Sequence, residues 1–216
     1  ATPTALMVGI GKAAEKQILI KDAAALENLR RIDALVTDKT GTLTIPNRSI
    51  DFTKSDDLAL EERETLKPNA RKAMEALQKS GVEVYMMSGD KEEAAKYWAE
   101  KAGIKHYQSK VLPQDKEDMV RRLQTEGKRV AMVGDGINDS PALSAADAGI
   151  AISDGAQIAR EISDVTISGR DLFEVVTLKR ISNQLVKRIS ANYRFVMGFN
   201  LGLIGLGLAG VLQPGT

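Results

Sequence analysis

Three short apolar runs constrain the fold of this chain more than any other feature of its sequence. Each run has the length of a buried strand, and each leads at once into polar or glycine residues. The runs occupy residues 32–37, 82–87 and 129–133, and they lead into Asp38, Ser88 and Gly134-Asp135 respectively. In α/β proteins with parallel strands, functional side chains gather at the carboxyl ends of the strands. The sequence therefore predicts one polar site built from three distant parts of the chain.

Segments with helical composition separate these runs. Pro68 suits the first turn of a helix, and Gly81 is placed to end that helix. Residues 13–29 are also helical in composition apart from the apolar Ile18-Leu19-Ile20, whereas residues 45–64 show no clear period. The alternation predicts an α/β fold, a Rossmann-like parallel sheet with helices on both faces. Further helices are expected at residues 91–102, 113–126, 140–146 and 171–193, and further strands at 148–152 and 165–167.

Composition excludes several classes of site. The chain has 216 residues, enough to bury a core, and its net charge of +1 gives no reason to expect a nucleic-acid partner. It has no cysteine, so disulfides, thiolate metal sites and a cysteine nucleophile are excluded. The single histidine, His106, cannot form a zinc site alone and is interpreted as an ordinary surface or strand-end residue.

The first strand opens into the sequence Asp-Lys-Thr-Gly-Thr-Leu-Thr, residues 38–44. A strand fixes the position of Asp38, and Gly41 allows the backbone to approach a phosphate closely. Carboxylates in such positions can act as nucleophiles that form aspartyl-phosphate intermediates. We therefore interpret Asp38 as a nucleophilic carboxylate.

Phosphoryl transfer to a carboxylate requires a nucleophile, a metal ion, donors to the phosphoryl oxygens and a cation near the leaving charge. A hard oxygen site of the kind that carboxylates provide suits magnesium. The sequence offers Asp38 as the nucleophile, Asp135 with Asp139 for magnesium, Ser88 and Thr40 as donors, and Lys116 or Lys39 as the cation.

Four motifs carry a resemblance to a known family. Residues 38–44 match the phosphorylation signature of P-type ATPases, and residues 134–143, GDGINDSPAL, match their hinge and metal motif. Ser88-Gly89-Asp90 matches the family's Thr-Gly-Asp, with a serine that keeps the hydroxyl, and Lys116 matches its phosphate-facing lysine. Over most of residues 33–164 the chain resembles the phosphorylation domain of heavy-metal-transporting P-type ATPases, within the haloacid-dehalogenase superfamily.

The resemblance implies roles for individual residues, with Mg²⁺ as cofactor and ATP as the phosphoryl donor in an intact pump. The implied catalytic residues are Asp38, Lys116, Ser88 and Thr40. The implied magnesium ligands are Asp38, Asp135 and the carbonyl of Thr40. The implied contacts to phosphate or nucleotide are Lys39, Gly89, Asp90, Gly134, Asn138 and Asp139.

Both flanks resemble the same subfamily. Residues 1–22 resemble the segment after its intramembrane Cys-Pro-Cys motif, and residues 195–212 resemble its fifth core membrane helix. This uncharged apolar run follows the basic Lys187, Arg188 and Arg194 and has the length of a bilayer crossing. The resemblance implies a cell-membrane location with a cytoplasmic catalytic domain. The expected domains are residues 1–31 as an N-terminal stalk-like segment, 32–170 as the phosphorylation domain, and 171–216 as a stalk helix with a membrane-helix-like segment.

One part of the family pattern is missing. In the family, a nucleotide-binding domain is inserted where residues 45–64 form a short linker, and no His-Pro signature for adenine recognition is present. The actuator domain and the cysteine-containing transport site are also absent from the sequence. These differences predict a fragment, an engineered form or a reduced relative that hydrolyses ATP poorly on its own.

Three functions are consistent with these residues. The first is the phosphorylation core of a pump that exports a soft monovalent or transition-metal ion such as copper or zinc. The second is a free-standing phosphatase, although the superfamily's phosphatases carry a second Asp where this chain has Thr40. A hydroxyl is a poor proton shuttle near neutral pH, so the sequence argues against rapid turnover. The third is a non-catalytic regulatory fragment, which leaves the complete set of catalytic residues unexplained.

Overall fold

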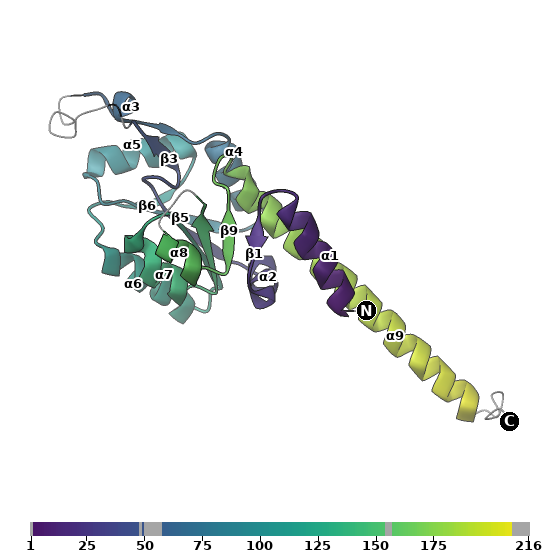
Figure 1. Cartoon of the computed structure of the whole chain (residues 1–216). Helices are drawn as coiled ribbons and strands as arrows, with labels where there is room; N and C mark the ends of the chain where they lie inside the picture. The colour runs from purple at the N-terminus through teal and green to yellow at the C-terminus, as the bar shows by residue number, and fades with distance from the viewer. Residues whose placement is uncertain (1, 48, 50–57, 154–156, 209–216) are drawn as a thin grey trace.

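A computed structural model describes residues 2–47, 49, 58–153 and 157–208. Helices and strands alternate along most of the chain (Figure 1). In chain order the elements are α1 (Thr2–Ala14), β1 (Leu19–Ile20), α2 (Ala23–Arg30), β2 (Ala34–Asp38), β3 (Thr44–Pro46), α3 (Leu60–Arg63), β4 (Glu64–Leu66), α4 (Ala70–Lys79), β5 (Glu83–Met87), α5 (Glu92–Ala102), β6 (His106–Gln108), α6 (Pro113–Thr125), β7 (Val130–Gly134), the 3₁₀ turn η2 (Ile137–Asp139), α7 (Ser140–Ala145), β8 (Ala148–Ile152), α8 (Gln157–Ile162), β9 (Val165–Ile167) and α9 (Phe173–Leu208).

The main sheet confirms the predicted α/β architecture. Within the described residues its strand order is β1-β9-β8-β7-β2-β5-β6, and every neighbouring pair is parallel except β1 with β9. Strand β2 lies between β5 and β7, the other two strands predicted to contribute to the site. The fold therefore brings the three predicted strand ends to one edge of the sheet.

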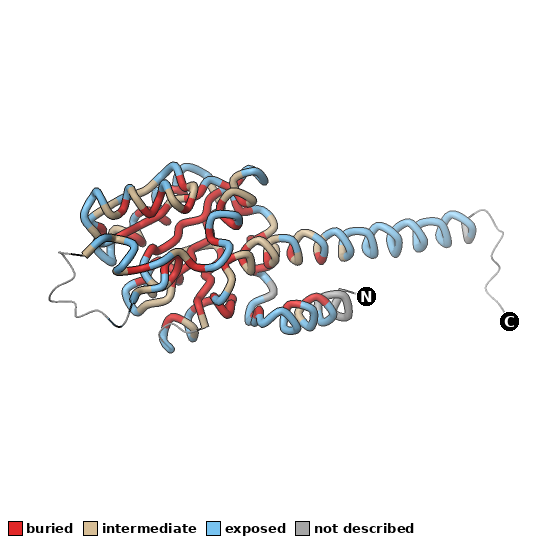
Figure 2. The backbone as a smooth tube through the Cα atoms, turned by 90° about the horizontal axis from the view of Figure 1, so that it is seen from above, coloured by how far each residue is buried: buried red, intermediate tan, exposed pale blue. Residues whose placement is uncertain are grey.

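Helices cover both faces of the sheet, as predicted. Strands β2, β7 and β8 are buried at every position, which explains why they read as nearly continuous apolar runs rather than alternating ones. One core contains side chains from α2, α4, α5 and α9, and a second core on the opposite face contains side chains from α6 and α7. Figure 2 shows this buried interior inside an exposed shell.

Most predicted elements are found within two residues of their expected ends. Helix α4 begins at Ala70 rather than at Pro68, because Asn69 has a left-handed conformation (φ 57°) that a helix cannot include. The amino end of α6 is fixed by Asp115, whose side chain accepts a 2.7 Å hydrogen bond from the backbone of Leu112. This helix carries Lys116, so its start helps to set the position of that side chain.

Residues 45–64 could not be assigned from their sequence pattern. Part of this segment forms strands β3 and β4, which pair antiparallel in a small ribbon beside the main sheet. Residues 48 and 50–57 lie outside the described residues. The ribbon matters for the site because β3 follows the Asp38 loop directly.

The long helix α9 includes residues 195–208 of the run 195–212 that was expected to resemble a membrane helix. Helix α9 runs without a break through Leu208, and residues 209–212 lie outside the described part. No helix within the described residues has an apolar stretch long enough to cross a membrane. An 18-residue stretch that ends at Leu208 takes in Asn192, Arg194 and Asn200 as well as several glycines, and these lower its mean hydropathy.

Candidate active site

Asp38 is the last residue of β2, and the sheet register defines its neighbours. It pairs with Met87 of β5, so Ser88 follows one position beyond, and Thr37 pairs with Val133 of β7. Asp38 and Ser88 are buried, and their strands are parallel, so both residues lie at the carboxyl edge of the sheet. The predicted convergence of the strand ends is therefore present.

Lys116 joins this edge from helix α6. Its ammonium group donates 2.6 Å hydrogen bonds to Oδ1 of Asp38 and to Oδ1 of Asp139. The lysine side chain is 9% exposed, and those of Asp38 and Asp139 are 11% and 2% exposed. A buried ammonium held between two carboxylates has a fixed position and a strong charge effect because little water screens it.

Asp139 also organises the turn after β7. Its Oδ2 accepts hydrogen bonds of 3.1 Å from the backbone N–H groups of Asp135 and Gly136. Gly134 has to lack a side chain, because a Cβ there would lie 2.6 Å from the same oxygen. One carboxylate therefore holds the loop that carries Asp135 and the lysine that reaches Asp38.

The loop after β2 passes very close to Asp135. Gly41 has a φ of +78°, and a Cβ at this position would lie 1.9 Å from Oδ2 of Asp135. The loop is closed by backbone hydrogen bonds from Leu43 and Thr44 to the carbonyl of Lys39, at 2.8 and 3.0 Å. A glycine is thus required here both by the backbone conformation and by the carboxylate that faces it.

The electrostatics of the cluster reflect crowded carboxylates. Burial, followed by the charge of Asp139, raises the pKa of Asp38 to about 7, although Lys116 acts in the opposite direction. Burial and the charge of Asp139 also raise the pKa of Asp135. Burial disfavours the charged form of Lys116, but the Asp38 and Asp139 carboxylates outweigh it, so the pKa of Lys116 is raised.

These carboxylates form a set that a hard cation fits. Ligand atoms of Asp38, Asp135 and Asp139 lie within 4.8 Å of one another. Carboxylate oxygens are the ligands that magnesium prefers, and burial together with the repulsion between the carboxylates raises the pKa values of Asp38 and Asp135. All three carboxylates were expected at this site from the sequence, and the carbonyl of Thr40 stays a prediction as a further ligand.

Lys39 occupies a second buried network next to the first. Its side chain, 2% exposed, forms ion pairs with Glu64 of β4 and with Asp90, the latter at 2.7 Å. A hollow of about 400 Å³ is lined by Lys39, the exposed Thr40, Gly89 and Asp90, among others. Because Lys39 is engaged there, Lys116 is the lysine that contacts Asp38.

The remaining predicted residues lie around these two networks. Ser88 is fully buried, and its hydroxyl accepts a 3.2 Å hydrogen bond from the backbone of Asp90. Asn138 is exposed in η2. The structure does not place either side chain in hydrogen-bond contact with Asp38.

Two residues of the site were missed from the sequence. Glu64 lies in the unassigned segment, and no sequence signal indicates that it pairs with Lys39. Thr42 lies inside the motif of residues 38–44, and its hydroxyl is the sequence signal that could have identified it as a possible hydrogen-bond donor. Within the described part of the chain its buried hydroxyl has no hydrogen-bond partner.

Comparisons with known proteins agree with this geometry. The family described as haloacid dehalogenase-like hydrolase matches residues 48–147, a range that begins after Asp38. The chain is 29% identical to a copper-exporting P-type ATPase of Staphylococcus aureus (strain MW2) over 312 aligned positions, covering 99% of this chain and 39% of the relative. It therefore spans about two fifths of the length of that relative.

Solved structures share the fold. A zinc-transporting PIB-type ATPase in the E2.Pi state superposes with a TM-score of 0.85 at 24% identity, covering 98% of this chain and 51% of the other. A 3-deoxy-D-manno-octulosonate 8-phosphate phosphatase from Moraxella catarrhalis superposes with a TM-score of 0.58 at 19% identity, covering 77% and 97%. The chain is thus similar over nearly its whole length to a copper-exporting P-type ATPase, shares the fold of a zinc-transporting PIB-type ATPase, and matches the haloacid dehalogenase-like hydrolase family over residues 48–147.

Proposed function

We propose that this chain is the phosphoryl-accepting core of an ATP-driven heavy-metal export pump, with Asp38 as the residue that is phosphorylated. The observation that carries the proposal is Lys116, whose buried ammonium bridges Asp38 and Asp139 beside Asp135. A structural ion pair needs one carboxylate, whereas this lysine contacts two, with Asp135 as a third beside them, at the carboxyl edge of a parallel sheet. Such a cluster is the environment that a phosphoryl group and its counter-ion require.

In the proposed reaction, an ionised oxygen of Asp38 attacks the γ-phosphorus of ATP. A new O–P bond forms, the bond from this phosphorus to the bridging oxygen breaks, and ADP leaves with the electron pair. Lys116 neutralises charge that develops on the phosphoryl oxygens, and Asp139 holds Lys116 in place. Ser88 and Thr40 are the proposed hydrogen-bond donors to the same oxygens.

Asp38, Asp135 and the carbonyl of Thr40 are the proposed magnesium ligands. The bound ion would offset the negative charge of the carboxylates and of the incoming phosphate. The attack of Asp38 on the γ-phosphorus requires an ionised carboxylate. Because the pKa of Asp38 is raised, the carboxyl must first lose its proton, and a bound cation would favour that loss.

Thr40 separates this proposal from phosphatase activity. A free-standing phosphatase of this superfamily would use a carboxyl group at this position to activate water. Because a threonine hydroxyl cannot do so efficiently near neutral pH, the aspartyl phosphate is expected to persist.

The intact protein would supply what this chain lacks. The alignment with the copper-exporting relative runs over 312 positions although the chain has 216 residues, so roughly a hundred positions have no counterpart here. We propose that the intact protein carries a nucleotide-binding domain inserted where this chain has residues 45–64. The proposed domains of this chain are the stalk-like segment 1–31, the phosphorylation domain 32–170, and the stalk helix with the membrane-helix-like segment 171–216. We place the intact pump at a cell membrane, with this domain on the cytoplasmic side and copper, zinc or a similar ion as cargo.

The mass of the chain after incubation with acetyl phosphate and magnesium tests the proposal. Wild type should gain one phosphoryl group, and Asp38→Asn should not. Asp118→Asn, which removes an exposed carboxylate of the same helix as Lys116, is the matched control and should behave as wild type. Absence of an adduct together with no release of phosphate would refute a catalytic role, and rapid release of free phosphate would indicate a phosphatase.

A further inference from the structure

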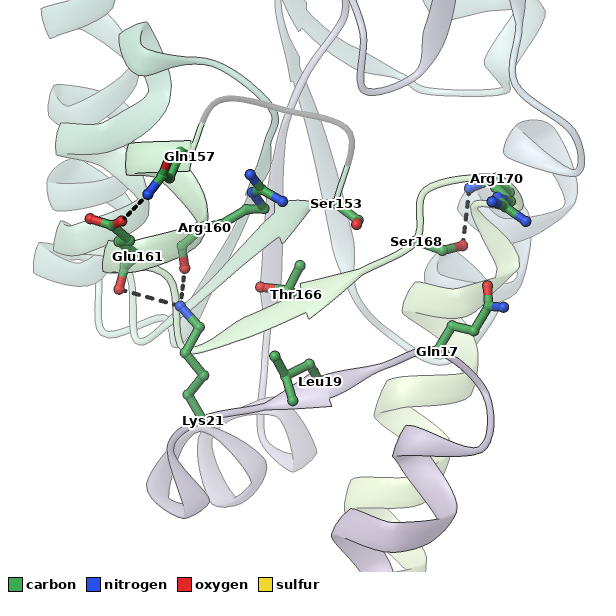
Figure 3. A pocket seen from close by; sticks show the side chains of 10 residues that line it. All are labelled: Gln17, Leu19, Lys21, Ser153, Gln157, Arg160, Glu161, Thr166, Ser168 and Arg170. Atoms are coloured by element: carbon green, nitrogen blue, oxygen red, sulfur yellow. Dashed lines mark hydrogen bonds between the residues drawn. The ribbon is translucent and has the colours of Figure 1, made fainter.

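A hollow of the described surface lies away from the Asp38 cluster. It has a volume of about 590 Å³, within the usual range for small-molecule sites. Its floor is the antiparallel pair of β1 and β9, where Leu19 lies opposite Thr166 (Figure 3). Helix α8 forms one wall, and the residues that follow β9 form the other.

Basic side chains dominate the lining. The lining contains three basic residues, Lys21, Arg160 and Arg170, and one acidic residue, Glu161. The Glu161 carboxylate accepts a 2.8 Å hydrogen bond from the side-chain amide of Gln157. Lys21 donates to the last carbonyls of α8, which fixes it at that end. No carboxylate in the described parts of the chain forms an ion pair with Arg160 or Arg170.

Two polar groups in the hollow have no hydrogen-bond partner among the described residues. They are the hydroxyl of Thr166 and Nε of Arg160, and both atoms are buried. Thr166 as a whole is only 9% exposed, and Figure 3 shows its side chain directed into the hollow below Arg160. A buried hydroxyl or guanidinium nitrogen without a partner is costly, so such groups point to a ligand that supplies the missing bonds.

We propose that this hollow binds a small phosphate ester. Its phosphoryl group would accept hydrogen bonds from Arg160 and Thr166, since arginine matches the geometry of a phosphate and a hydroxyl adds a further donor. The organic part would lie over the exposed apolar surface of Leu19 toward Gln17 and Arg170. The hollow is several times larger than inorganic phosphate, which is why an ester fits better than the free ion.

Calorimetric titration of pyrophosphate into the full chain tests this site. EDTA is present throughout, so that magnesium at the Asp38 cluster cannot contribute. Arg160→Gln should weaken binding about tenfold or more, and Thr166→Val by roughly threefold to tenfold, as expected for charge-assisted hydrogen bonds. Thr166→Ser, which keeps the hydroxyl, should bind like wild type.

Two controls separate binding in this hollow from binding at the Asp38 cluster and from a general effect of charge. Arg71→Gln removes the same charge from an exposed ion pair elsewhere and should leave the affinity unchanged. Lys116→Met removes the only lysine bonded to Asp38 among the described residues and should also leave it unchanged. Loss of binding in Lys116→Met with retention in Arg160→Gln would place the ligand at the Asp38 cluster and overturn the proposal. Absence of binding at millimolar concentrations of both pyrophosphate and glycerol 3-phosphate, or equal losses in Arg71→Gln and Arg160→Gln, would overturn it as well.

The same variants identify the source of the phosphoryl group. Glycerol 3-phosphate represents a soluble ester, and vesicles that contain phosphatidic acid represent a lipid headgroup. Binding of either probe that depends on Arg160 and Thr166 supports the site and assigns its source. Binding of either probe that is indifferent to both residues contradicts it.

Discussion

Replacing Asp38 by Asn tests the charge balance of the site, because it removes one of three carboxylates that crowd around a single lysine. The pKa of Asp38 rises from 3.8 to about 7 on folding. At pH 8 such a shift corresponds to a penalty of about 4 kcal/mol for the ionised carboxylate in the folded, metal-free chain. The pKa of Asp38 already includes the favourable effect of Lys116, so this figure is the net penalty that Asn removes. Asp38→Asn should therefore raise the free energy of unfolding at pH 8 by up to about 4 kcal/mol.

The pH dependence of this gain provides a sharper test. The pKa of Asp38 is higher in the folded chain than in the unfolded one, so folding favours the protonated carboxyl. The penalty is absent below about pH 4, grows as the pH rises toward 7 and is complete above that value. The advantage of Asp38→Asn over wild type should thus fall by about 2–3 kcal/mol between pH 8 and pH 5.

Urea unfolding followed by circular dichroism, with EDTA present, measures both quantities. Wild type, Asp38→Asn and the exposed control Asp118→Asn are compared at pH 8 and pH 5, and the control should stay within about 0.5 kcal/mol of wild type. Because each value is a difference from wild type, the titration of carboxylates far from the cluster cancels. A destabilised Asp38→Asn at pH 8, or the same difference at both pH values, would refute the reasoning.

Two further substitutions test the loop and the second lysine. Gly41→Ala should destabilise the chain by more than about 2 kcal/mol in urea unfolding and abolish phosphorylation, because it adds a clash with Asp135 to the strain of a left-handed residue. The control Gly81→Ala has a similar φ of +86° but open space around it, so it should cost only about 1 kcal/mol. Glu64→Gln should lower the free energy of unfolding by about 2 kcal/mol, because it leaves Asp90 as the remaining acidic partner of buried Lys39. The control Glu75→Gln, in an exposed ion pair with Arg71, should lower it by less than about 1 kcal/mol. Equal effects of the two substitutions would contradict a structural role for the Lys39 network.

The sequence was sufficient to predict which strand ends meet, because that outcome depends only on local patterns and on a general rule. Asp38, Ser88 and Asp135 each follow an apolar run, and parallel strands bring their carboxyl ends to one edge. The edge strand β6 was not predicted, since His106-Tyr107-Gln108 is polar and none of the three is fully buried. Such a strand is defined by its partner β5 rather than by its own pattern.

Pairings between side chains could not be predicted for a different reason. The choice between Lys39 and Lys116 as the cation beside Asp38 depends on where each side chain ends in three dimensions. Glu64 lies 25 residues after Lys39, in a segment without periodicity, yet it is the residue that engages Lys39. Helix α9 was predicted as two segments because its composition changes from basic to apolar near Phe195, although the helix itself continues through this point.

The two buried lysines of the site differ in a way that indicates where a cation belongs. Lys39 faces two carboxylates, and one of them, Asp90, has a side chain that is 39% exposed and is therefore partly stabilised by water. Lys116 contacts two of the three carboxylates of the cluster and Lys67 also acts on Asp135, so the fully ionised cluster keeps an excess of negative charge. Burial makes that excess costly, as the raised pKa values of Asp38 and Asp135 show. A divalent cation at the Asp38 cluster would offset this charge, which is the role proposed above for magnesium, whereas the partly exposed Asp90 leaves the Lys39 network with less need of one.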